Sequence, residues 1–446
     1  MTPTTASPDS AAATSASGSF ADVVATLAGI APGDGLAEAR SRRPDAREHA
    51  QGSFAALFVP ADASEVSLPE RAAVALFVAR LHEQPAAVAF YGALLRETGG
   101  GAGLEPLIVA EAERAAGSGP YGAFRAENAP ESVDGPGYSV ASVEAAYALG
   151  DRLSAALEHA HMLVLHPRDA SREHLQRLLD AGWSTTAVVT LSQLVSFLAF
   201  QLRVVQGLTA VGAGSDADAD GPAALAAAVA RAAEERAAGT IAAPPVPAAE
   251  TLPPAPRVTE PARFTQEVLG WKPWLEPLPV ADFTEAHYEA LVERERVHMP
   301  YFRLLARDPE ALRERTLTDI DIFFNPDAGL PRAEREIAAA AASRFNGCVF
   351  CASVHSRFAT EQGADRAEVQ RLLDEGVSAR VDPRRDALVD ATVALTATPP
   401  RFGSAEVESL RGAGLGELDL LDAIQAGAFF NWANRLMLSL GEPTVA

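Results

Sequence analysis

The chain has 446 residues, a formal net charge of −22 and two cysteines. So acidic a chain repels polyanions, which argues against nucleic acid or a membrane as a partner. The length exceeds one ordinary hydrophobic core and predicts two domains joined by a linker.

The composition favours helices along the whole chain. Alanine is abundant, and it is accompanied by Leu, Arg and Glu, which also favour helix. Stretches that alternate between apolar and polar residues with a period of two are few. We therefore expect an all-α fold.

The first part of the chain divides into a tail and a domain. Residues 1–20 lack the basic start and apolar core of a signal peptide and are predicted to form a disordered tail. A helical domain is expected over residues 21–210, called here the first half. Its apolar run at residues 185–200 contains Thr, Ser and Gln and is shorter than the ~20 residues of a membrane-spanning helix. A buried helix of a soluble, cytoplasmic protein is expected.

The composition changes between residues 211 and 258. An acidic stretch rich in Gly, Ser and Asp is followed by an Ala-rich stretch compatible with a helix, and then by a Pro-rich stretch. We interpret residues 211–258 as an Ala/Pro-rich linker. Residues 259–446, called here the second half, are expected to form a second helical domain.

The two halves are predicted to be related by duplication. The segments that follow Leu68-Pro69 and Leu330-Pro331 align for about twenty residues when Arg71 is set on Arg335. Residues 181–203 align with residues 413–435 in the same chain order. The first copy then lacks the reactive groups of the second, which makes it a structural or partner-binding copy. The residues Glu336, Cys348, Cys351 and His355 stand opposite Ala72, Gln84, Ala87 and Tyr91.

Both cysteines lie in FNGCVFCASVHS, residues 345–356. Asn346-Gly347 predicts the end of one helix, and a second helix is expected from Cys348 to Gly363. Positions 348, 351 and 355 then share one helical face. The unpaired N–H groups of a first helical turn favour a thiolate, and cysteines three apart have the spacing that a disulfide needs.

Two acid–base groups accompany the thiols. His355 can accept a thiol proton, and Glu336, on the preceding helix, can face the thiols or orient His355. Zinc is the main alternative, because Cys348, Cys351, His355 and Glu336 are all suitable ligand types. Structural zinc, however, usually takes its ligands from two separate knuckles, whereas three of these residues lie on one helix. The cysteines could also be inert core residues, and Glu336 a solvated charge.

Other conspicuous residues are assigned packing or surface roles. His159 and His161 point to different sides of a helix, so a shared metal with His166 is not expected. Trp271 and Trp274 are predicted to pack in the core rather than to line the site.

The spacing from Glu336 to His355, E-x11-C-x2-C-x3-H, resembles the signature of the AhpD-like alkylhydroperoxidases of the carboxymuconolactone decarboxylase superfamily. The flanking LPRAERE and AGAFFNWANRL resemble its peroxidase-related branch. The resemblance implies two AhpD-like helical domains in tandem, the first of them degenerate. It also implies a thiol peroxidase without a cofactor, in which Cys351 attacks the peroxide, Cys348 resolves the product as a disulfide, and Glu336 and His355 relay protons.

The same resemblance implies the partners. They are an organic hydroperoxide as substrate, a dithiol reductant of the lipoyl type carried on another protein, and further copies of the chain in a homo-oligomer. The best-studied members have a histidine directly before the second cysteine, where this chain has Phe350. This departure leaves open a thiol–disulfide oxidoreductase, or a redox-sensing oligomeric scaffold, with little peroxidase activity. Because the superfamily's decarboxylases lack the CxxC pair, the retained thiols argue against lactone decarboxylation.

Overall fold

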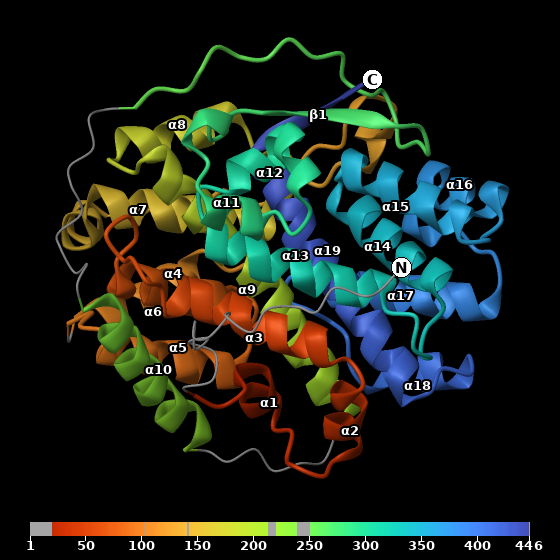
Figure 1. Cartoon of the computed structure of the whole chain (residues 1–446), viewed down its shortest axis with the longest axis horizontal. Helices are drawn as coiled ribbons and strands as arrows, with labels where there is room; N and C mark the ends of the chain where they lie inside the picture. Colours follow the sequence, from red (N-terminus) through yellow and green to blue (C-terminus); the bar gives the residue numbers. More distant parts are fainter. Residues whose placement is uncertain (1–19, 102, 141, 213–219, 239–249, 446) are drawn as a thin grey trace, which may run out of the picture.

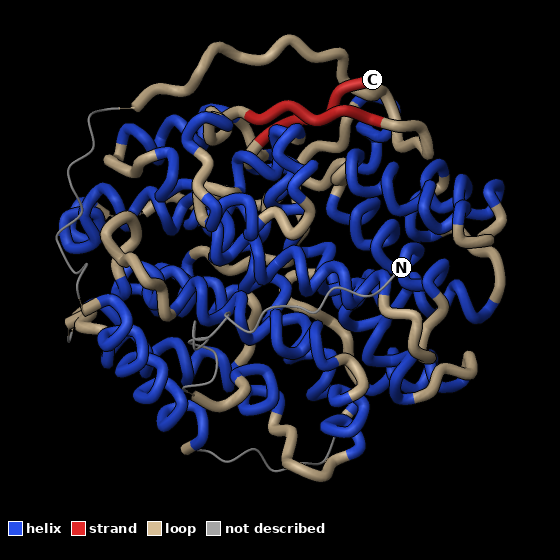
Figure 2. Tube along the Cα trace, in the orientation of Figure 1, coloured by secondary structure: helices blue, strands red, loops and turns tan. Residues whose placement is uncertain are grey.

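The computed structural model describes residues 20–101, 103–140, 142–212, 220–238 and 250–445. Helices make up nearly all of the regular structure of these residues (Figures 1 and 2), which confirms the all-α prediction. The predicted tail lies outside the described residues except for Phe20, whose ring packs edge-on against Phe54.

The α-helices of the first part of the chain are α1 (Val23–Ala28), α2 (Gly35–Ser41), α3 (Pro44–Phe58), α4 (Leu68–Leu81), α5 (Pro85–Glu97), α6 (Leu104–Arg114), α7 (Val143–Leu165), α8 (Arg172–Asp180), α9 (Thr185–Val211) and α10 (Gly221–Ala237). Those of the second half are α11 (Glu285–Ala290), α12 (Pro300–Leu305), α13 (Pro309–Phe324), α14 (Arg332–Asn346), α15 (Val349–Glu361), α16 (Arg366–Asp374), α17 (Pro383–Thr396), α18 (Ser404–Gly412) and α19 (Glu417–Ser439). Short 3-10 helices are η2 (Ala126–Glu131), η3 (Pro167–Asp169), η4 (Val280–Asp282), η5 (Arg294–His298) and η6 (Gly376–Ser378).

One small sheet was not expected from the sequence. Strand β1 (Leu269–Pro273) pairs antiparallel with β2 (Gly441–Val445), with Trp271 opposite Pro443. Trp271 packs inward and donates a hydrogen bond from Nε1 to the carbonyl of Met437 at 3.0 Å. The sheet therefore fastens the beginning of the second half to the segment that follows α19.

Helices α9 and α19, both buried along most of their length, pack against each other at the centre of the fold (Figure 1). Trp432 of α19 stacks on Phe200 of α9 with ring centroids 5.7 Å apart, and its Nε1 donates to Gln193 at 3.0 Å. Among the described residues, α9 is the one helix long and apolar enough to cross a membrane, and its apolar window is entirely buried in the protein. The prediction that residues 185–200 form a buried helix is confirmed.

Two buried arginines make reciprocal contacts across the α9–α19 pair. Arg203 of α9 donates from Nη2 to the carbonyl of Thr396 at 2.8 Å, and Arg435 of α19 donates from Nη2 to the carbonyl of Val164 at 3.2 Å. Each guanidinium also donates from Nη1 to the carbonyl four residues earlier in its own helix. A contact between two related halves would pair equivalent residues in this way. The duplication itself stays a prediction.

A second contact between the halves is ionic. Arg43, at the beginning of α3, donates from Nε and Nη2 to both carboxylate oxygens of Asp422 in α19, at 2.9 and 2.8 Å. Both side chains are almost fully buried, and α3 also packs along α13. An ion pair with two hydrogen bonds fixes the orientation of α3 relative to α19. It therefore sets the angle at which the halves meet.

Within residues 211–258, which the sequence analysis interprets as a linker, the structure describes one packed helix. Helix α10 packs against α5, and its Leu225 and Val229 are buried. Burial of this apolar face outweighs the flexibility that the composition suggests. Residues 250–258 run without helix or strand along the outside of the molecule (Figure 2). The predictions for residues 213–219 and 239–249 lie outside the described residues.

The central helix pair provides the first testable prediction. A Cβ atom at Gly207 of α9 would stand 2.6 Å from Ile424 Cγ2 of α19. We expect Gly207→Ala to force the helices apart and lower the free energy of unfolding by about 1–3 kcal/mol, despite the better helix propensity of alanine. Denaturant unfolding measures this change. The control is Gly35→Ala, where the added methyl meets no atom within 4 Å; equal stability of both variants would contradict the prediction.

Candidate active site

The two cysteines follow a sharp turn between two helices. Helix α14 ends at Asn346, and Gly347 adopts a left-handed conformation with φ 81°, as the Asn-Gly pair predicts. Cys348 is the N-cap of α15, so this helix begins at Val349, one residue later than expected. Cys351 lies in the first turn of α15.

The first half of the chain braces this turn. Arg168 donates a hydrogen bond from Nη1 to the carbonyl of Phe345 at 3.0 Å. A Cβ atom at Gly347 would stand only 2.6 Å from the Arg168 side chain. Glu131 pairs with Arg344 at 2.6 Å. Glycine is thus required at position 347 both by φ and by space, and the turn that carries the thiols is held by residues of the other half.

Both thiols are free and buried, with exposed fractions of 2% for Cys348 and 5% for Cys351. Burial raises the pKa of the Cys351 thiol well above its ordinary value, and the adjacent Cys348 thiol raises it further. This direction is opposite to the thiolate preference expected in a first helical turn, and loss of water around the sulfur is its largest cause.

The buried carboxylate of Glu336 pairs with the partly buried imidazole of His355. His355 Nδ1 lies 2.6 Å from Glu336 Oε2, and Arg332 donates from Nε to the other carboxylate oxygen at 3.1 Å. The imidazole packs on Phe430, with ring centroids 4.0 Å apart. Its Nε2 has no hydrogen-bond partner among the described residues. The carboxylate thus orients the ring and leaves one nitrogen able to exchange a proton.

Further polar residues lie near the thiols or His355 and were not recognised from the sequence. The buried hydroxyl of Tyr301 has no hydrogen-bond partner in the part of the chain that the structure describes, and burial raises its pKa to about 12. Burial also raises the pKa of Asp319, which the charges of Arg315 and His355 oppose. Asn434 of α19 lies beside Cys351. The sequence signal for them is weak: Arg315 and Asp319 are four residues apart on an otherwise apolar helical face.

The histidines and tryptophans noted in the sequence analysis have packing and surface roles, as predicted. Burial lowers the pKa of His159 to about 3 and that of His161 to about 4, so both rings are neutral at pH 7. His166 contacts Asp169 through Nδ1 at 2.9 Å. Trp271 and Trp274 are buried. Within the described residues, no group of three or more His, Cys, Asp and Glu side chains is placed to hold a metal ion.

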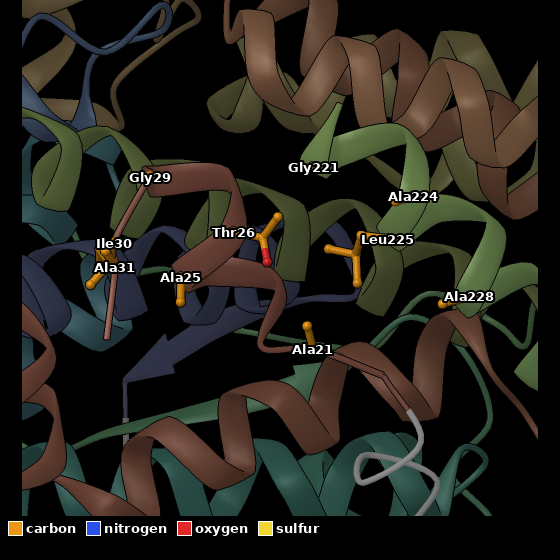
Figure 3. Close-up of a pocket in the computed structure, with 10 residues that line it drawn as sticks. All are labelled: Ala21, Ala25, Thr26, Gly29, Ile30, Ala31, Gly221, Ala224, Leu225 and Ala228. Atoms are coloured by element: carbon orange, nitrogen blue, oxygen red, sulfur yellow. The ribbon is translucent and has the colours of Figure 1, made fainter. Parts of the chain in front are cut away.

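A surface groove lies elsewhere, between α1 and the beginning of α10 (Figure 3). Small and apolar residues line it, among them Ala25, Ile30 and Leu225. None of its lining residues is titratable, and the hydroxyl of Thr26 donates a hydrogen bond to the backbone carbonyl of Asp22 at 3.0 Å. The chemistry of the chain is therefore concentrated at the thiols and not in this groove.

One family model matches the segment that contains this site. Residues 309–394 match the model of the carboxymuconolactone decarboxylase family, and this segment contains both thiols, Glu336 and His355. The match supports the predicted superfamily resemblance for the second half. A crystal structure of an uncharacterized peroxidase-related protein from Silicibacter sp. TM1040 is also similar, with 25% identity over 36% of this chain and 82% of that chain, at a TM-score of 0.29. Comparison with curated proteins gave no significant match.

The burial of Cys351 predicts how its reactivity depends on pH. Because its pKa is raised, the thiol form dominates at pH 7, and the thiolate increases only as the pH rises beyond the ~8.5 of a free cysteine. We expect the rate of Cys351 alkylation by iodoacetamide to keep rising through pH 9, whereas the denatured chain levels off near its ordinary pKa. Peptide mass spectrometry at a series of pH values measures this. A plateau below about pH 8 would contradict the assignment.

Proposed function

We propose that the protein is a thiol-dependent peroxidase that reduces organic hydroperoxides through Cys351 and Cys348. The observation that carries this proposal is the pair of free thiols at the beginning of α15, on a helix that also presents the Glu336-bound His355. A nucleophile, a partner thiol and an oriented base are the groups that such a reaction needs. The match of residues 309–394 to the superfamily supports it.

In the first step, His355 takes the proton of the Cys351 thiol. If Nδ1–H donates to Glu336, Nε2 carries the lone pair that accepts this proton, and the buried carboxylate stabilises the imidazolium. The Cys351 thiolate attacks the terminal oxygen of the hydroperoxide, and the O–O bond breaks. The leaving alkoxide takes the proton from His355, so the products are an alcohol and a sulfenic acid.

In the second step, the Cys348 thiol attacks the sulfenic sulfur of Cys351. A disulfide forms and water leaves. Cysteines three apart at the beginning of a helix can be bridged without unfolding the helix. An external dithiol, which we propose to be a lipoyl-type group on another protein, then reduces the disulfide and is itself oxidised. We further propose a cytoplasmic homo-oligomer in which the first half has a structural role.

A second candidate function is thiol–disulfide exchange with little peroxide chemistry. Phe350 stands where the best-studied relatives have a histidine, so a proton carrier between the cysteines is missing. The raised pKa of Cys351 also keeps the attacking thiolate scarce at neutral pH. Rapid oxidation of the thiols by cumene hydroperoxide would favour the peroxidase, whereas oxidation only by disulfides would favour exchange.

The two cysteines have different predicted roles. We expect Cys351→Ser to abolish peroxide consumption, because the attacking sulfur is lost. Cys348→Ser should still react once and retain a sulfenic acid, which a dimedone adduct on Cys351 detects by mass spectrometry. Wild-type protein treated with one equivalent of peroxide should lose both thiols without forming intermolecular links. Equal residual turnover in the two variants would refute the assignment.

The carboxylate–imidazole pair can be tested separately. We expect Glu336→Gln to slow Cys351 oxidation by about 100-fold at pH 7, because the neutral amide no longer stabilises the imidazolium. The variant should also show an altered pH profile, which a purely structural defect would not produce. Stopped-flow oxidation measures both. The matched control is Glu361→Gln, a half-exposed residue of α15 paired with Arg357, which should leave the rate unchanged.

A further inference from the structure

We propose that Arg315 and Tyr301 form an anion-binding subsite beside Cys351, which makes hydroperoxides of organic acids the preferred substrate class. The substrate part of this inference rests on the proposed function. The subsite itself does not, because it concerns two donor groups that the fold buries without partners.

Arg315 is the unusual arginine of this protein. Eight arginines are buried among the described residues, and seven of them donate hydrogen bonds to carbonyl or carboxylate oxygens: Arg40, Arg43, Arg71, Arg203, Arg335, Arg344 and Arg435. Arg315, only 5% exposed, has no hydrogen bond or ion pair with any described residue, and its Nε is fully buried. Because a buried charge without hydrogen bonds is costly, its donors are expected to serve a ligand.

Aromatic rings hold the Arg315 guanidinium without occupying its N–H groups. Its Cζ lies 5.2 Å from the ring centroid of Phe429, 5.7 Å from that of Trp432 and 5.8 Å from that of Tyr301. Cation–π contacts of this kind stabilise the charge through the faces of the rings. The donors in the guanidinium plane stay available for an anion.

Tyr301 supplies a second unused donor in the same place. Its hydroxyl is buried and has no partner among the described residues. Arg315 favours the thiolate of Cys351 electrostatically, and the two thiols in turn disfavour ionisation of Tyr301. Both donors therefore lie within electrostatic reach of the reactive sulfur.

The neighbouring acid Asp319 does not form an ion pair with Arg315. Asp319 lies one helical turn after Arg315, but no ion pair or hydrogen bond joins them. Burial raises the pKa of Asp319, which works against its negative charge. The Arg315 guanidinium can bind a substrate carboxylate through two hydrogen bonds, and the Tyr301 hydroxyl can donate a third. The surrounding aromatic rings can contact the carbon chain of the substrate.

A pair of alkylating agents tests the subsite without any peroxide. Iodoacetate and iodoacetamide react with a thiolate in the same way, but only iodoacetate has a carboxylate. In Cys348→Ser protein, where Cys351 is the single thiol, we expect iodoacetate to be favoured relative to its reaction with free cysteine. Adding Arg315→Met should reduce the iodoacetate-to-iodoacetamide rate ratio by about 10-fold or more, whereas Arg315→Lys should retain most of it.

The controls separate charge at the subsite from charge elsewhere. Arg313→Met removes an exposed arginine of the same helix and should leave the ratio within about twofold of the parent, because solvent and salt screen exposed charges. Tyr301→Phe keeps the ring and should lower the ratio less than Arg315→Met. An unselective parent protein, or an unchanged ratio in Arg315→Met, overturns the subsite. Circular dichroism confirms that each variant is folded; if Arg315→Met does not fold, the parent ratio and Tyr301→Phe decide.

The substrate class is tested with a hydroperoxy carboxylic acid and its methyl ester. The protein should oxidise Cys351 faster with the acid, and Arg315→Met should remove that preference. Selective alkylation without oxidation by either compound would refute the proposed peroxidase and leave the subsite intact. Oxidation by both compounds at equal rates would leave the peroxidase intact and overturn the substrate preference.

Discussion

The structure depends on two guanidinium groups buried where the halves meet. Arg203 and Arg435 lie in the central helices, and each donates a hydrogen bond from Nη2 to a backbone carbonyl of the opposite half. Burial lowers the pKa of Arg435 to about 9, which shows how much the interior disfavours its charge. Separating the halves would expose apolar surface and leave both guanidinium groups without those acceptors. The halves are therefore expected to unfold together as one unit.

The contact between α9 and α19 also makes the thiol site rigid. Helix α19 packs on α9 with one face, and the same helix supplies Phe430 beside His355 and Asn434 beside Cys351. Arg168 of the first half also donates a hydrogen bond to the turn before Cys348. A half that contains no cysteine thus contacts the turn that carries both thiols.

Local rules predicted the parts of the molecule that local interactions decide. The Asn346-Gly347 stop, the helices on either side and the approach of Glu336 to His355 follow from turn chemistry and helical spacing. The features that the sequence analysis missed depend on tertiary burial. The packing of α10, the β1–β2 pairing and the raised pKa of Cys351 all depend on neighbours distant in sequence. The spacing of the motif likewise gave no indication of an unpaired Arg315, because its isolation depends on the rings around it.

The β1–β2 pairing has a consequence for synthesis of the protein on the ribosome. Residues 269–273 find their partner only after residues 441–445 have emerged, and the Arg203 acceptors at 396–397 also lie far downstream. Long loops must therefore close before either half is complete, which slows folding. During translation the apolar faces of α9 and of the early helices stay uncovered until these partners emerge, and exposed apolar surface favours aggregation over folding.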